Sequence, residues 1–375
     1  MSSMYNDYLI ESYPSLPENP ETGQWYEVAP EGSRCSEGSA WHGLVRLGTD
    51  AGKVLVFFLG GGVSLNEEMS RDNARRCVFA PTVIFQDYIV EYGILSDAPE
   101  NPFRNWTRLV VEYATGDFHV GTNEFRCTGI DKSVNHIGYR NYALFMDEVL
   151  PLIGEPGTLV VTGSSAGGFA TALLTDDVMA RIPSATNVTA CVDSALLYYD
   201  GWLQTARGLW RAPDAICERL TGDNIVLDAL VALRRIHNGV KILFTGSTHD
   251  HDLQLYQTYI DTGVMSFETT HASSALYLDN LRRMCADMRE QLPGVGLYIW
   301  EAGLNPKDGS TQHMIMPAPN CFDPLSGEKS VAEWLYDATQ GDVRSYGLEL
   351  LEGSAFQWQA LLPAIGTSLY TCHKG

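Results

Sequence analysis

Short, almost entirely apolar runs recur along the chain, and several of them are followed by glycines. The run Val-Leu-Val-Phe-Phe-Leu at 54–59 precedes three glycines, and Leu-Val-Val-Thr at 159–162 precedes Gly-Ser-Ser-Ala-Gly-Gly. Short runs without polar alternation are typical of strands that are buried on both faces of a sheet. Six runs predict strands at 54–59, 108–113, 159–162, 187–192, 241–245 and 296–300.

Stretches with helical spacing of apolar residues lie between these runs, at 139–149, 168–179, 224–237 and 272–288. Alternating buried strands and helices predict an α/β fold, with a mainly parallel twisted sheet and helices on both faces. In such sheets the chemistry lies at the carboxyl ends of the strands. The residues that follow each apolar run are therefore the candidates for a functional site.

The chain contains no linker or internal repeat that would divide it cleanly. Residues 1–30 are polar, rich in proline and without periodicity, which predicts an N-terminal extension to a single α/β domain at 31–375. Segments around 198–235 and 264–291 are rich in large apolar residues and are interpreted as cap insertions. Trp202 and Trp210 either form a lid or acyl pocket, or belong to a helical cap packed on the core.

The charge balance narrows the range of partners. The chain has 46 acidic and 25 basic residues and a net charge of −21, which argues against nucleic acid and anionic membranes as partners. No apolar run reaches the roughly 18 residues of a membrane helix, and the first residues lack the pattern of a secretory leader. We therefore expect a cytoplasmic protein with reduced thiols. The eight cysteines form no Cys-x-x-Cys pair, which excludes a zinc ribbon.

The strongest chemical signal is the segment Gly-Ser-Ser-Ala-Gly-Gly at 163–168, which follows a predicted strand and opens a predicted helix. This is the G-x-S-x-G pattern in the strand–turn–helix context that a nucleophile elbow requires. The glycines leave room for a sharp turn, and the turn exposes Ser165. The N-terminus of the following helix favours developing negative charge. We predict that Ser165 is a nucleophile rather than part of a structural turn.

A second glycine-rich segment follows the strand at 54–59. Glycines allow backbone N–H groups to approach a ligand closely, so Gly61 and Gly62 are candidates for an oxyanion hole. Ala166, the residue after the nucleophile, supplies another N–H group in enzymes with this turn. A phosphate-binding loop is the poorer interpretation, because no Gly-Lys-Ser/Thr follows.

A serine nucleophile needs a histidine that accepts its proton near neutral pH. His313 is the best candidate, because it follows the last predicted strand on a polar loop. The other histidines after Ser165 lie in predicted helices, beside the candidate acid or near the C-terminus. They are His237, His249, His251, His271 and His373.

The acid that orients the histidine should follow an earlier strand. Asp250 is favoured over Asp252 after the strand at 241–245, and Asp193 after the strand at 187–192 is a third candidate. The segment His-Asp-His-Asp at 249–252 also suggests metal binding. Alternate side chains on an extended segment point to opposite faces, so these four residues are not expected to converge on a metal.

These motifs occur in an order that resembles the pectin acetylesterase family, which also contains the Notum-type carboxylesterases. The resemblance runs from about residue 35 to 340. It rests on Cys-Ser-Glu-Gly-Ser at 35–39, the glycines at 60–62, Asn-Pro at 101–102, Asn-Trp at 105–106, Tyr-Ala-Thr-Gly-Asp-Phe-His-Val-Gly at 113–121, His-Ile-Gly-Tyr-Arg-Asn at 136–141, the turn at 163–168, Asp-Ser at 193–194, Thr-Gln-His-Met-Ile at 311–315 and Ser-Val-Ala-Glu-Trp-Leu at 330–335.

The resemblance implies an α/β-hydrolase-like fold. It places the family's serine on Ser165, its acid on Asp250 and its histidine on His313. Asp117 and His119, within the 113–121 motif, are expected to bind substrate or to hold the turn.

The chain departs from the family pattern where Val63 and Ser64 replace Trp-Cys and where Ala114 replaces a cysteine. Loss of both cysteines fits an intracellular relative without disulfides. The resulting hypothesis is a serine esterase that removes an acetyl or other short acyl group from a small-molecule or carbohydrate ester, without metal or organic cofactor. A thioesterase or acyltransferase of the same fold and an inactive binding protein are the alternatives.

Overall fold

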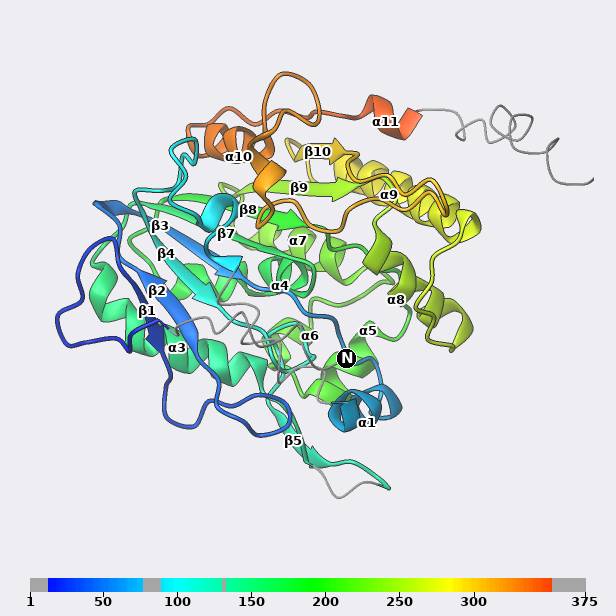
Figure 1. Cartoon of the computed structure of the whole chain (residues 1–375), viewed down its shortest axis with the longest axis horizontal. Helices are drawn as coiled ribbons and strands as arrows, with labels where there is room; N and C mark the ends of the chain where they lie inside the picture. Colours follow the sequence, from blue (N-terminus) through cyan, green and yellow to red (C-terminus); the bar gives the residue numbers. More distant parts are fainter. Residues whose placement is uncertain (1–12, 77–88, 130–132, 353–375) are drawn as a thin grey trace, which may run out of the picture.

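The computed structural model describes residues 13–76, 89–129 and 133–352, and its centre is an eight-stranded sheet (Figure 1). The strand order across the sheet is β1-β2-β4-β3-β7-β8-β9-β10. The strands are β1 (Trp25–Val28), β2 (Gly43–Arg46), β3 (Asp50–Phe58), β4 (Trp106–Val111), β7 (Thr158–Ser164), β8 (Asn187–Asp193), β9 (Lys241–Ser247) and β10 (Gly296–Trp300). A separate hairpin of β5 (Asn123–Arg126) and β6 (Ser133–His136) projects from the body of the protein.

All six strands that the apolar runs predict are present, and they pair in parallel with one another. The two remaining strands, β1 and β2, add an antiparallel edge beside β4. Each has only four residues, so neither produces an apolar run that marks it in the sequence. The predicted α/β class with a mainly parallel sheet is therefore confirmed.

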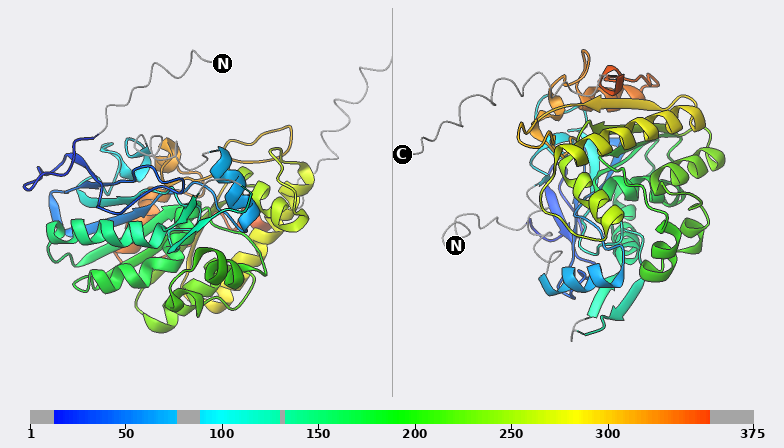
Figure 2. Two further views of the ribbon diagram at one scale, coloured as in Figure 1. Left: turned by 90° about the horizontal axis from the view of Figure 1, so that it is seen from below. Right: turned by 90° about the vertical axis from the view of Figure 1, so that its right-hand side faces the viewer.

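Helices surround the sheet, and Figure 2 shows α3, α4 and α7 gathered along one side of it. The regular helices are α1 (Glu67–Arg76), α3 (Gly138–Ile153), α4 (Ala166–Arg181), α7 (Ile225–Ile236), α8 (His251–Thr262), α9 (His271–Gln291) and α10 (Val331–Thr339). Shorter turns of helix are η1 (Gly93–Leu95), α5 (Trp202–Gln204), η2 (Thr205–Trp210), α6 (Asp214–Cys217), η3 (Pro319–Phe322) and α11 (Glu349–Glu352). The four helices predicted from apolar spacing correspond to α3, α4, α7 and α9.

Polar side chains fix where several helices begin. Asn224 and Asp250 each accept a backbone N–H of the first turn, of α7 and α8 respectively. Thr270 and Ser330 form capping boxes at the starts of α9 and α10. Such a cap typically stabilises a helix by about 1 kcal/mol, so these residues favour helices that begin at these positions.

The segments interpreted as cap insertions contain connections of the sheet. The connection from β8 to β9 includes α7, and the connection from β9 to β10 includes α8 and α9. Trp202 and Trp210 are fully buried and contact the stacked rings of Phe118 and Phe169. The two tryptophans are therefore packed on the core, the second of the two alternatives that the sequence leaves open.

The core consists of strands that are covered on both faces. All residues of β4 and β10 are buried, as are the last five of β3. Within the part of the chain that the structure describes, six cysteines are buried thiols outside any disulfide. Among the described residues, none of the helices combines the length and the apolar composition of a membrane span.

The register of the parallel strands brings the carboxyl ends together. Phe58 of β3 pairs with Gly163 of β7, and Ser164 pairs with Asp193 of β8. The glycine loop after β3 and the turn after β7 therefore begin side by side at one edge of the sheet.

Candidate active site

The turn between β7 and α4 holds Ser165 in a strained conformation. Its backbone has φ 56° and ψ −126°, which a residue with a side chain rarely adopts and which is maintained only when the surroundings enforce it. A Cβ on Gly163 would lie 2.5 Å from the carbonyl oxygen of Phe58, and a Cβ on Gly167 would collide with that same oxygen. Both glycines are therefore needed for the close packing of β7, α4 and β3 that forces the sharp turn.

The turn is also fixed by hydrogen bonds, and it presents its serine outward. The Ser165 N–H donates to the Asp193 carbonyl oxygen at 3.0 Å, and the Ser165 carbonyl oxygen accepts the Gly168 N–H at 2.8 Å. Ser165 is partly exposed, whereas Ser164 and Ala166 beside it are buried. Ala166 is the first residue of α4, where backbone N–H groups have no partner within the helix and attract negative charge.

The glycine loop packs directly against this turn. A Cβ on Gly60 would lie 2.7 Å from the Cβ of Ser165, so only glycine allows the approach. Gly62 has φ +88°, the left-handed conformation that glycine adopts without strain. The preceding residue, Leu59, is anchored through its N–H to the Val111 carbonyl oxygen at 3.0 Å.

Asp117 and His119 are hydrogen-bonded to backbone groups of neighbouring segments. Both are buried, and the His119 Nε2–H donates to the Leu59 carbonyl oxygen at 2.8 Å. Burial lowers the pKa of His119 to about 4, so the ring is neutral. The Asp117 carboxylate accepts the backbone N–H groups of His119 and Gly138 at 3.1 and 2.8 Å. Of the two roles expected for these residues, these hydrogen bonds correspond to the second, which is to hold the turn at 113–121 and the segment before the glycine loop.

His313 and Asp250 form a hydrogen-bonded pair. His313 Nδ1 lies 2.8 Å from Asp250 Oδ2, and the exposed fractions of the two side chains are 9% and 0%. The second oxygen of Asp250 accepts the Leu253 N–H at 3.0 Å, because Asp250 is also the N-cap of α8. Burial disfavours the charged imidazolium, but the charge and hydrogen bond of Asp250, assisted by Asp252 and Asp193, outweigh it and raise the pKa of His313 to about 9.

A short parallel bridge between two loops brings this pair together. Asp250 pairs with Thr311, whose N–H donates to the His249 carbonyl oxygen at 2.8 Å. The Thr311 carbonyl oxygen in turn accepts the His251 N–H at 3.1 Å. His313 lies two residues beyond Thr311, so the bridge fixes its distance from the carboxylate.

Asp252 has a different environment. It is 52% exposed, and its Oδ1 lies 2.7 Å from Nδ1 of the neighbouring His251. Of the two aspartates after β9, it is Asp250 whose carboxylate bonds His313.

Asp193, the third candidate acid, anchors the loop that carries His313. Its Oδ2 accepts the Ser164 hydroxyl at 2.6 Å and the N–H groups of Ile315 and Met316, both at 3.0 Å. Burial raises the pKa of Asp193, and these hydrogen bonds oppose that effect. Asp193 thus connects the strand before Ser165 to the chain just after His313.

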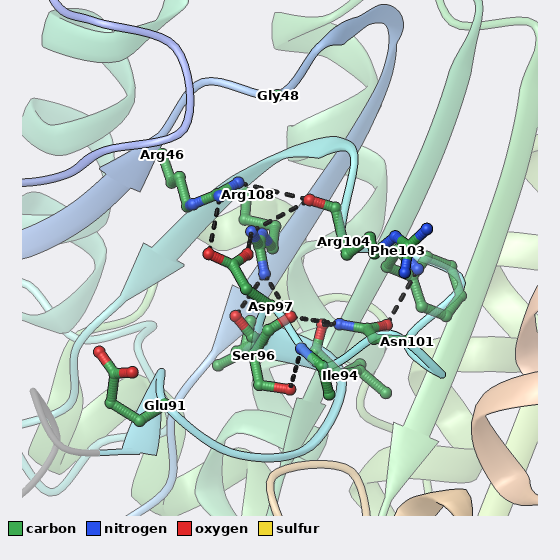
Figure 3. Close-up of polar contacts among 12 residues, drawn as sticks. Arg46, Gly48, Glu91, Ile94, Ser96, Asp97, Asn101, Phe103, Arg104 and Arg108 are labelled. Atoms are coloured by element: carbon green, nitrogen blue, oxygen red, sulfur yellow. Dashed lines mark hydrogen bonds and ion pairs between the residues drawn. The ribbon is translucent and has the colours of Figure 1, made fainter.

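The same loop is held from a second side by a buried arginine, which Figure 3 shows pointing at a turn. Arg108 of β4 is fully buried and donates to the Ser96 carbonyl oxygen at 2.8 Å and to Asp97 Oδ1 at 2.6 Å. The turn that Arg108 fixes includes Ile94, whose N–H donates to the Met316 carbonyl oxygen at 3.0 Å. The segment after His313 is therefore clamped between Asp193 and this turn.

The other histidines considered after Ser165 have partners elsewhere. His237 Nε2 lies 2.6 Å from Asp176, and His249 Nδ1 lies 2.9 Å from the Thr248 hydroxyl. His271 begins α9, and residue 373 lies outside the described residues. Among the residues that the structure describes, no group of three or more His, Cys, Asp or Glu side chains has an arrangement that would hold a metal.

Ser165 and His313 line one pocket of about 360 Å³. Its walls are formed by Gly60, Gly61, Gly62, Ser165, Asp252, Leu255, Tyr256, His313 and Met314. No motif identifies Leu255 or Tyr256 as a site residue, and Met314 occurs only as part of the segment at 311–315. Their only signal is position, because Leu255 and Tyr256 lie five and six residues beyond the candidate acid and Met314 follows the candidate base.

Two comparisons with known proteins find similar proteins. The pectinacetylesterase family model matches residues 26–204, which confirms the resemblance to this family and classes the chain as a carboxylesterase-type hydrolase. Among solved structures, the Wnt deacylase Notum from Drosophila is similar, with a TM-score of 0.58 at 16% sequence identity. The alignment covers 85% of this chain and 94% of the Notum chain, and it shows that the two share an α/β-hydrolase-like fold. A comparison with curated protein sequences gave no match.

Proposed function

Because residues 26–204 match the pectinacetylesterase family, we propose that the chain hydrolyses carboxylic esters through Ser165, His313 and Asp250. The observation that carries this proposal is the 2.8 Å contact between His313 Nδ1 and Asp250 Oδ2 at a pocket that Ser165 also lines. Only the Nε2 of His313 is then left to exchange a proton with the serine hydroxyl.

In the acylation step, Ser165 Oγ attacks the ester carbonyl carbon while His313 Nε2 accepts the hydroxyl proton. Asp250 keeps the proton on Nδ1 and stabilises the imidazolium that forms. His313 then donates the proton to the leaving alcohol oxygen. Water, activated by the same nitrogen, attacks the acyl-enzyme, releases the carboxylic acid and regenerates the serine.

The negative charge of each tetrahedral intermediate falls between two backbone segments. Gly61 and Gly62 lie on the glycine loop that packs against Ser165, and Ala166 lies at the N-terminus of α4. We assign the oxyanion hole to their N–H groups. In enzymes of this kind one such donor typically contributes about 2.7–4 kcal/mol to transition-state stabilisation.

The proposed substrate is a short acyl ester, an acetyl ester above all, on a carbohydrate-like alcohol. The pocket of about 360 Å³ is at the lower end of the range for small-molecule sites, which extends from about 300 to 1,000 Å³. The matching family is that of the pectinacetylesterases, and the structurally similar Notum from Drosophila is a Wnt deacylase, so both relatives remove acyl groups.

Hydrolysis of p-nitrophenyl acetate, butyrate and octanoate by the wild type and by Ser165→Ala tests this function. The wild type should prefer acetate or butyrate. The variant should fall to background with an unchanged thermal unfolding temperature. Near-full activity in Ser165→Ala would exclude the proposed nucleophile, and acyl transfer to added alcohols in preference to water would identify an acyltransferase instead.

A further inference from the structure

Tyr256 of α8 places its hydroxyl against the proposed oxyanion loop. A Cβ on Gly62 would collide with the Tyr256 Oη, so the phenol occupies the space beside the Gly62 backbone. Tyr256 also lines the pocket shared by Ser165 and His313. The side chain is therefore next to the segment that we assign to the oxyanion.

The hydrogen bonds of this hydroxyl leave its proton available. The Val63 N–H donates to the Tyr256 oxygen, which uses one of its acceptor positions. A phenol has one proton to donate, and among the described residues no acceptor takes it. Burial raises the pKa of Tyr256, so the group stays protonated and remains a donor across the neutral range.

The placement of α8 connects the two sides of the site. The helix begins at the N-cap Asp250, which bonds His313, and Tyr256 lies six residues further along. Six residues of α-helix correspond to about 9 Å along the axis. The helix α8 therefore positions both the Asp250 carboxylate at His313 and the Tyr256 hydroxyl beside the glycine loop.

We propose that Tyr256 is a catalytic residue, whose hydroxyl donates a hydrogen bond to the ester carbonyl oxygen as negative charge develops there. This inference rests on the proposed esterase function. Tyr256 is then a side-chain member of the oxyanion hole, next to the Gly62 N–H. The Val63 N–H polarises the hydroxyl and makes it a stronger donor, because hydrogen bonds in a chain reinforce one another.

The test compares Tyr256→Phe with Tyr259→Phe. Tyr259 lies one turn further along α8, and its hydroxyl accepts the Asn66 side-chain amide at 2.8 Å. Removal of one oxyanion donor typically lowers kcat about 10²–10³-fold. We expect Tyr256→Phe to lower kcat for p-nitrophenyl acetate about 10²-fold with little change in KM, and Tyr259→Phe to change it less than about twofold.

Rates are expressed per active site, counted by complete labelling with a fluorophosphonate, so that unfolded protein does not contribute. A second measurement uses a trifluoromethyl ketone, which forms a tetrahedral adduct with an active serine. Its inhibition constant should rise in Tyr256→Phe by about the factor by which kcat/KM falls, because both report stabilisation of the oxyanion.

Three results would overturn the inference alone: Tyr256→Phe with wild-type kcat, a change confined to KM, or equal losses in the two tyrosine variants. In each case the wild type would still lose activity on Ser165→Ala, so the esterase function would stand. A wild type that neither hydrolyses these esters nor reacts with the fluorophosphonate would overturn both proposals.

Discussion

The substitution Asp250→Asn removes the charge behind His313 and leaves the helix cap in place. The single oxygen of the new amide side chain would be required by two donors, the Leu253 N–H and the His313 Nδ1–H. Asparagine is as good an N-cap as aspartate, so we expect the cap to retain the oxygen. The amide NH₂ would then face Nδ1 and favour the tautomer that cannot accept the serine proton. A change of this kind lowers kcat about 10⁴-fold in a Ser-His-Asp triad.

The pKa of His313 indicates how strongly Asp250 stabilises the protonated ring. Asp250 contributes most of the attraction that raises this pKa from 6.5 to about 9. A shift of that size corresponds to about 3 kcal/mol of preferential stabilisation of the imidazolium. Catalysis needs the neutral ring, so wild-type kcat/KM should rise with pH through a limb centred well above 6.5. In Asp250→Asn the opposing effect of burial dominates, and the limb should move below 6.5.

The assay is kcat/KM for p-nitrophenyl acetate between pH 5 and 9.5, corrected for spontaneous hydrolysis, with Asp252→Asn as the matched control. Asp252 is half-exposed and bonds His251. Removal of its charge should therefore lower the midpoint pH of the rising limb slightly and change the maximal kcat/KM less than about threefold. A small effect of Asp250→Asn together with a large effect of Asp252→Asn would refute the assignment of the acid. An unchanged pH limb in Asp250→Asn would refute the account of the pKa.

Two further predictions concern Asp193 and Arg108, which hold the loop that carries His313. Asp193→Asn places an amide among the Ser164 hydroxyl and the N–H groups of Ile315 and Met316. It should lower the free energy of unfolding by about 2–3 kcal/mol and kcat at least tenfold, measured by urea unfolding and ester hydrolysis. A variant with wild-type stability would show that these bonds do not hold the loop. Arg108→Leu removes the buried charged hydrogen bonds to the turn at 93–97. It should lower the free energy of unfolding, measured with urea, by about 2–4 kcal/mol. A decrease below about 0.5 kcal/mol would show that Arg108 does not hold this turn.

Local patterns identify a large part of the fold from the sequence. The six parallel strands are buried on both faces, so each leaves an uninterrupted apolar run. The turn at Ser165 is equally visible, because its glycines and the strand and helix around it are consecutive in the chain. β1 and β2 are not predicted, because each has only four residues and no local pattern marks them. They are stabilised by antiparallel pairing at the edge of the sheet.

The site is less accessible to sequence reasoning, because its contacts join distant segments. Asp250 and Asp252 are two residues apart, and what distinguishes them is a hydrogen bond to His313, 63 positions away. Asp117 and His119 have the residue types of a binding site, but both side chains are buried and hydrogen-bonded to backbone groups. Tyr256 carries no motif, and its relevance follows from its contact with Gly62 across the pocket.

Covalent labelling measures whether His313 activates Ser165. The protein is treated with a fluorophosphonate, and the modified residue is located by peptide mass spectrometry that resolves Ser165 from the adjacent Ser164. We expect stoichiometric modification of Ser165 in the wild type and labelling slowed at least 10³-fold in His313→Ala. Absence of the label from Ser165, or equal labelling of the His313→Ala variant, would contradict the activation of Ser165 by His313.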